Sequence, residues 1–67
     1  MTTDRDIWRS AHIMLKQHAG DAAVVAAQRA DEMLAKGDVE GQLVWKRIVD
    51  AINELQRTQP GSNDHLN

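Results

Sequence analysis

The 67-residue sequence has no cysteine and only one proline, and two tryptophans are its only aromatic residues. The absence of cysteine excludes a disulfide scaffold and every cysteine-containing zinc site. No apolar run approaches the ~20 residues that are needed to cross a bilayer. The formal net charge is −2, so the chain lacks the overall basic excess of many nucleic-acid-binding proteins.

The length and the N-terminal sequence limit the class of protein further. A chain of 67 residues has room for one small domain. The segment MTTDRDIW lacks the basic segment and apolar core of a signal peptide, and we expect a bacterial, cytoplasmic protein. Such a short chain buries only roughly 60% of the surface that its unfolded form exposes, so a homodimer is expected.

Helix-boundary residues divide the chain into three helices. Thr3 and Asp6 have the spacing of a capping box at the start of the first helix. Gly20, in a left-handed conformation, and Gly37 are placed to end the first and second helices. Asp21 and Asp38 are placed to cap the second and third helices.

The predicted fold is therefore all-α, a compact three-helix domain over residues 1–57. Its helices are expected at about 4–18, 22–36 and 39–57, and the short connections between them predict antiparallel neighbours. Pro60 and Gly61 end the ordered part, so residues 58–67 are expected to form a flexible C-terminal tail.

Apolar residues at helical spacing predict the core. The second helix is rich in alanine on this face, which allows a neighbouring backbone to come close. The third helix has the widest apolar stripe, as expected of a helix that contacts both others. The predicted core residues are Ile7, Ala11, Met14, Leu15, Ala23, Ala26, Ala27, Ala30, Met33, Leu34, Gly41, Val44, Trp45, Ile48, Ala51, Ile52 and Leu55, flanked by Val49.

Four apolar residues lie at the edge of these stripes or outside them. Trp8 lies at the edge of the first stripe, and tryptophan is enriched at the centres of protein interfaces. Ile13, Val25 and Leu43 point away from the core face of their helices. Single exposed apolar residues are common, but one on every helix suggests a second apolar surface for self-association or for another protein.

A basic stripe is the best-defined polar feature. Arg5, Arg9, His12 and Lys16 fall within about 60° of one another on the first helix. The stripe is either a solvated helix face or a surface for phosphates or an acidic partner. Asp50 and Glu54 of the third helix have the opposite charge and are candidates to pair with it across a dimer.

Nucleic-acid binding is the alternative function. Its candidate residues lie on the first and third helices, and the short turn before the third helix invites comparison with a helix-turn-helix. The acidic residues Glu40, Asp50 and Glu54 on the third helix weigh against this reading. The candidates are Arg5, Arg9, Lys16, Lys46 and Arg47.

No catalytic, metal or cofactor site is expected. Ser10 and Ser62 lack the G-x-S-x-G turn of a serine nucleophile, and no glycine-rich phosphate loop is present. His12 and His18 fall about 120° apart on the helix, so they do not readily share a metal ion. A domain this small also has little volume for a small-molecule substrate.

Three segments give the chain a resemblance to a family. These are Ile7-Trp8, the RADE run at 29–32, and the stretch from Gly37 to Ile48 with the pattern GD-x-x-G-x-x-x-W-K-R-I. The sequence from about residue 4 to 57 resembles a group of short, uncharacterised helical proteins of alphaproteobacteria. The resemblance implies a stand-alone cytoplasmic three-helix protein, and it assigns no activity, ligand or functional residue.

The sequence thus favours a protein of unknown function that acts as a small, non-enzymatic helical module for protein–protein interaction or regulation. Its partner is expected to be a second copy of the chain or another protein, not a membrane or a small molecule.

Overall fold

The computed structural model describes residues 3–58, and this part of the chain folds into three α-helices and a short 3-10 turn. The helices are α1 (Asp4–His18), α2 (Ala22–Ala35) and α3 (Val39–Thr58), and the turn η1 (Ala19–Asp21) joins the first two. The all-α prediction is confirmed. Thr58 still belongs to α3, and the rest of the predicted tail lies outside the described residues.

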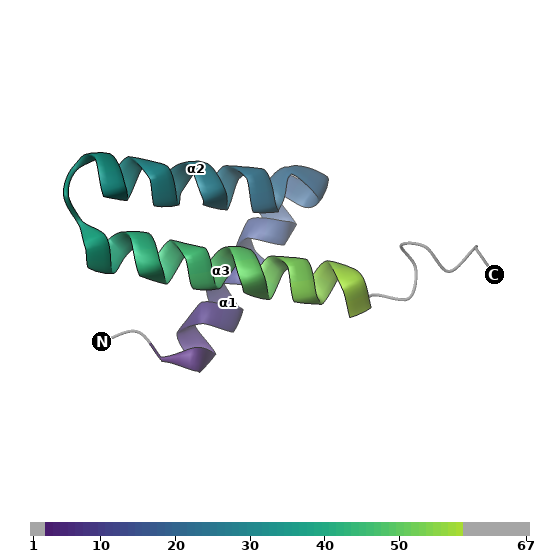
Figure 1. The fold of residues 1–67 in the computed structure, drawn as a ribbon. Helices are drawn as coiled ribbons and strands as arrows, with labels where there is room; N and C mark the ends of the chain where they lie inside the picture. Colours follow the sequence, from purple (N-terminus) through teal and green to yellow (C-terminus); the bar gives the residue numbers. More distant parts are fainter. Residues whose placement is uncertain (1–2, 59–67) are drawn as a thin grey trace.

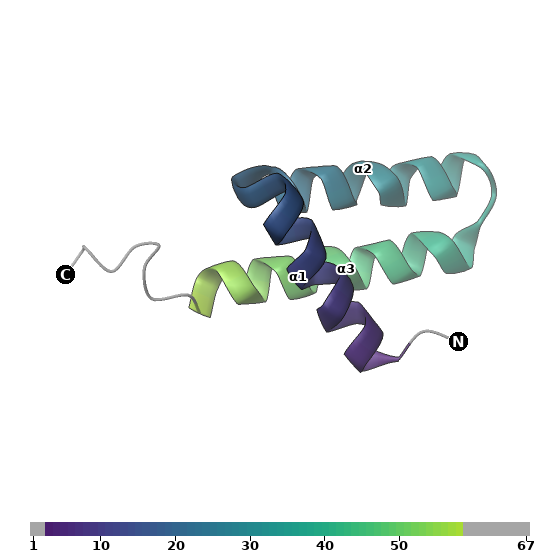
Figure 2. The ribbon, with the colours of Figure 1, turned by 180° about the vertical axis from the view of Figure 1, so that it is seen from behind.

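The second and third helices form an antiparallel hairpin, and α1 crosses one face of it (Figures 1 and 2). The predicted antiparallel packing therefore applies to α2 and α3, whereas α1 runs across the pair. Helix α1 lies against one face of the hairpin, and a groove opens where α1 meets α3.

Side-chain caps begin α1 and α3 as predicted. The Thr3 hydroxyl accepts a hydrogen bond of 3.2 Å from the Asp6 amide, and the Thr3 amide donates one of 3.4 Å to the Asp6 carboxylate. At α3, the Gly41 amide donates a bond of 2.8 Å to Asp38 Oδ1. Each cap satisfies backbone groups that a helix N-terminus leaves without partners.

The connection from α1 to α2 differs from the prediction in two ways. The positive φ, 49°, belongs to Ala19, not to Gly20. Asp21 precedes α2, but its side chain makes no capping hydrogen bond. The 3-10 turn η1 joins the two helices within three residues, and α2 leaves it at an angle to α1 (Figures 1 and 2).

Replacing Ala19 by glycine is expected to stabilise the protein. A positive φ costs a non-glycine residue on the order of 1–3 kcal/mol, and the added freedom of glycine in the unfolded chain offsets only part of that gain. We expect a net increase of about 1 kcal/mol in the free energy of unfolding, measured by urea denaturation. Gly20→Ala is the control, because a methyl group there meets nothing within 4 Å; a loss of stability in Ala19→Gly would contradict the assigned turn.

The turn between α2 and α3 follows the prediction. Gly37 has a φ of 82°, its amide donates to the Leu34 carbonyl at 2.9 Å, and the Asp38 amide donates to the Met33 carbonyl at 2.8 Å. This pair of bonds is a Schellman motif, which ends a helix at a glycine. The chain therefore reverses tightly, and α3 returns beside α2.

Gly41 lies in a closely packed position. A methyl group on Gly41 would lie 2.7 Å from the capping carboxylate of Asp38 and 3.1 Å from Cγ of Met33. The glycine therefore permits both the cap of α3 and the approach of α2.

Alanine makes up more than half of the buried core of the described chain. Five of the nine buried residues are alanines, and Ile52 is the largest side chain that is fully buried. Leu15, Val44, Trp45, Val49 and Leu55 pack against this core as predicted. Small side chains bring the helices close but bury little apolar surface per residue. The buried residues are Ile7, Ala11, Met14, Ala22, Ala26, Ala30, Ile48, Ala51 and Ile52.

The core face of α2 is rotated relative to the prediction. Ala22 is fully buried, whereas Ala27 and Leu34, both predicted core residues, are exposed. Val25, predicted to point away, packs partly buried against the core, and Val24 is exposed instead. The periodicity of α2 alone does not show which side of the helix the rest of the core packs against.

Candidate interaction surface

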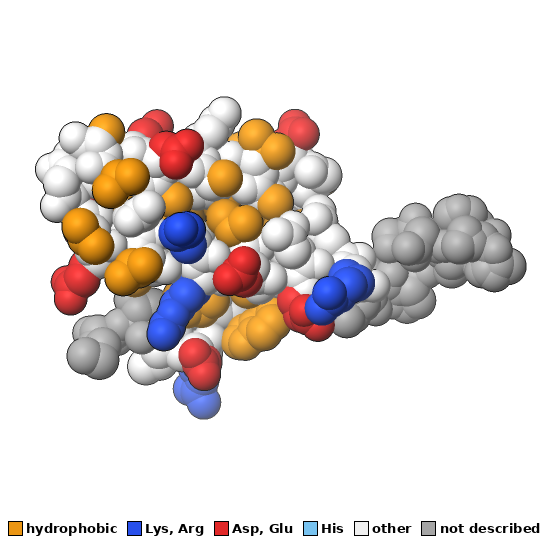
Figure 3. All heavy atoms as spheres, in the orientation of Figure 1, with side chains coloured by type: hydrophobic (Ala, Val, Ile, Leu, Met, Phe, Trp, Pro, Cys, Tyr) orange, Lys and Arg blue, Asp and Glu red, His pale blue; other side chains and the backbone are white. Residues whose placement is uncertain are grey.

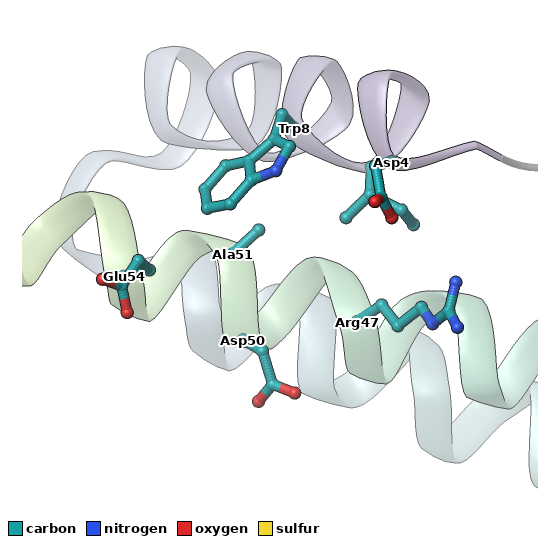
Figure 4. Close-up of a pocket in the computed structure, with 7 residues that line it drawn as sticks. Asp4, Trp8, Arg47, Asp50, Ala51 and Glu54 are labelled. Atoms are coloured by element: carbon teal, nitrogen blue, oxygen red, sulfur yellow. The ribbon is translucent and has the colours of Figure 1, made fainter.

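A groove runs between α1 and α3 on the surface of the molecule. It encloses about 520 Å³ and is open to solvent along its length. Figure 4 shows α1 and α3 on its two sides, with Trp8 of α1 above Ala51 of α3. The residues that line it are Asp4, Ile7, Trp8, Arg47, Asp50, Ala51 and Glu54.

The floor of the groove is apolar, and Trp8 forms its most accessible part. Ile7 and Ala51 are each only 5% exposed, whereas the exposed fraction of Trp8 is 40%. In Figure 4 the indole extends from α1 toward α3 and lies above Ala51 in the space between the two helices. A large aromatic side chain that remains partly exposed over an apolar floor has further surface to bury in a contact.

The rim of the groove carries charges of both signs. Asp4 of α1 and Arg47 of α3 lie at one end, and Glu54 lies toward the other (Figure 4). Glu54 is paired with Arg57 on its own helix. Asp50 points away from α1 on the outer side of α3 and is exposed, so an approaching molecule can reach its carboxylate.

All four residues of the basic stripe are exposed on α1. Arg5, Arg9, His12 and Lys16 form no ion pair with any residue of the described chain; the ion pairs there are Arg29–Glu32, at 3.6 Å, and Arg57–Glu54. Arg5 precedes Trp8 by three residues and His12 follows it by four, which places both beside the indole on the helix surface. The basic stripe therefore borders the groove.

The four predicted partner contacts lie in different places in the structure. Trp8 lines the groove. Leu43 does not line it, but it is 54% exposed and lies one turn before the groove residue Arg47 on α3. Ile13 is 47% exposed, but it lies about 140° from Trp8 around α1, away from the groove. Val25 packs partly buried against the core, so the prediction that it points away from the core is wrong, whereas its role as a partner contact stays a prediction.

Sequence patterns did not reveal the groove itself, because its two sides come from distant parts of the chain. They also missed the exposed Leu34 and Val39 beside the α2–α3 turn. The i,i+4 spacing of Val39 and Leu43 was the available signal for that apolar area.

The candidate nucleic-acid residues do not form one basic surface on α3. Arg47 lines the groove toward α1, whereas Lys46 lines a separate groove of about 250 Å³ between α2 and α3. Asp50 lines both grooves and lies between the two cations. Figure 3 shows acidic side chains interspersed with basic ones along α3, a pattern that weakens attraction for phosphates.

Metal-binding and membrane-spanning features are also absent from the described part of the chain. No group of three or more histidines and carboxylates in this part of the chain is arranged to hold a metal ion. None of its helices combines the length and the apolar character that crossing a membrane requires.

Comparisons with protein-family models, with curated proteins and with solved structures find no match. The resemblance to short helical proteins of alphaproteobacteria therefore stays a prediction.

Proposed function

We propose that this protein is a small, non-enzymatic helical module that binds another protein chain through the groove between α1 and α3. The observation that supports this proposal most strongly is the 40% exposed indole of Trp8, which lies above the buried Ala51 in a groove that the buried Ile7 also lines. Tryptophan in such a position is the residue type most often found at the energetic centre of an interface.

The form of the groove favours a protein segment over a small substrate. The groove is open along its length, and the carboxylates of Asp4 and Asp50 are exposed to water. Small-molecule sites instead enclose most of their ligand and place their polar groups in a dry cavity. An apolar centre with a charged, solvated rim is the usual anatomy of a protein interface.

Affinity capture with the tagged full chain tests the proposal. We expect retained proteins to be lost when the bait carries Trp8→Ala, because truncation of an interface tryptophan typically weakens binding by roughly 30-fold or more. Ile13→Ala is the matched control, since Ile13 is similarly exposed on the same helix but lies away from the groove. Retention that is unchanged by Trp8→Ala, or lost equally with Ile13→Ala, would contradict the assignment of this surface.

A further inference from the structure

We infer that the groove between α1 and α3 binds a second copy of this chain in a two-fold symmetric contact centred on Trp8. This inference rests on the proposed function and names the partner of that surface. In the contact, the Arg5 and His12 side of each α1 faces the acidic rim at Asp50 and Glu54 of the other copy.

The apolar centre of the surface suits a contact with itself. Near a two-fold axis each residue lies close to its own symmetry mate. The Trp8 indole lies in the groove above the buried Ala51, and 40% of its surface stays exposed, so the exposed part can pack against the indole and the α3 helix of a second copy.

The charged residues around the groove make this surface complementary to itself, which favours a second copy as the partner. A two-fold contact uses the same patch on both molecules, so that patch must carry both signs. This one does: Arg5 and His12 flank Trp8 on α1, and Asp50 and Glu54 lie across the groove on α3. Within the described chain, Arg5 and Asp50 have no ion-pair partner, so each is available to a partner molecule.

Other partners fit these charges less well. A nucleic acid would meet Asp4, Asp50 and Glu54 beside the basic stripe. The alanine-rich core is a second reason for self-association, because five of the nine buried residues contribute only a methyl group each to apolar burial. Small domains with a limited core commonly gain stability from an oligomer interface.

Sedimentation equilibrium of the full chain tests the inference. The protein concentration runs from roughly 10 µM to roughly 1 mM, because a contact between two such small domains is expected to be weak. We expect a concentration-dependent dimer. Trp8→Ala should raise the dissociation constant by roughly 30-fold or more, whereas Ile13→Ala should leave it within about three-fold. Circular dichroism checks that both variants remain helical.

A charge exchange on the surface tests the symmetric arrangement without altering the core. One variant carries Asp50→Lys and Glu54→Lys, and the other carries Arg5→Glu and His12→Glu. Each variant alone places like charges across the contact and should be monomeric. In an equimolar mixture the lysine rim of one variant faces the introduced glutamates of the other on one side of the axis. On the other side the native pairing of Arg5 and His12 with Asp50 and Glu54 is kept, so the mixture should form a heterodimer.

Three results would overturn the inference: a monomeric wild type at every concentration, a dimer unaffected by Trp8→Ala, or a mixture that stays monomeric while both variants are folded. If the wild type is monomeric but another protein is captured in a Trp8-dependent way, the second copy is the wrong partner and the proposed function stands. If capture is also independent of Trp8, both are wrong.

Discussion

Replacing Ile52 by alanine is expected to remove about 2–5 kcal/mol of the free energy of unfolding, a large share of the total. Ile52 is fully buried and is the largest side chain in the described chain that is so. Truncating a buried isoleucine to alanine costs about 2–5 kcal/mol, because apolar burial is lost and a cavity remains. A chain of this length has a free energy of unfolding of about 3–10 kcal/mol in total.

Urea denaturation followed by circular dichroism measures this effect, at one fixed protein concentration because self-association adds to the apparent stability. Val24→Ala is the control: Val24 is 58% exposed on α2, so its truncation should change the free energy of unfolding by less than about 0.5 kcal/mol. Similar losses in the two variants would contradict the position of Ile52 at the centre of the core.

Replacing Ala26 by leucine is expected to have the second largest effect. Ala26 is fully buried in the core cluster, where α2 packs beside α3. The three additional side-chain carbons can be accommodated there only by moving the helices apart, and overpacking of this kind typically costs about 1–3 kcal/mol. The loss occurs although leucine is a good helix former and more apolar than alanine.

The matched control for this variant is Ala27→Leu. Ala27 is the next residue on α2 but is exposed, so the same change should leave the free energy of unfolding within about 0.5 kcal/mol of the wild type. Thermal unfolding of the two variants at equal concentration makes the comparison. A stabilising effect of Ala26→Leu would show that the seam between α2 and α3 contains unfilled space.

Local signals in the sequence predicted most of the helix boundaries. The capping box at Thr3 and the cap at Asp38 each depend on residues within one turn, and the Gly37 turn depends on a positive φ that glycine accepts without strain. Such features do not depend on how the helices pack. For that reason the predicted ranges 4–18 and 39–57 are close to Asp4–His18 and Val39–Thr58.

The packing direction of α1 was not predictable in the same way. The sequence around residue 20 offers a glycine, but the structure assigns the positive φ to Ala19, and this turn sets the path from α1 into α2. The path in turn decides which side of α2 is covered. Val25 is therefore packed and Leu34 exposed, the reverse of what the periodicity of α2 indicated.

The interaction surface also depends on how the helices pack, which the sequence did not show. The sequence identified Trp8, Leu43 and the basic stripe as separate features. Only the crossing of α1 over α3 shows that Trp8 lies across a groove from Asp50, and that Ile13 belongs to a different face. Residues more than thirty positions apart met there, and no local pattern records such a contact.

The most direct measurement is the accessibility of the Trp8 indole as the protein concentration rises. The variant Trp45→Phe leaves Trp8 as the single tryptophan, and acrylamide quenching reports how much of it solvent can reach. We expect efficient quenching in the dilute monomer, consistent with 40% exposure, and protection with a blue-shifted emission at high concentration. A Trp8 indole that remains equally quenched at every concentration, in a folded protein, would contradict a second copy covering the groove.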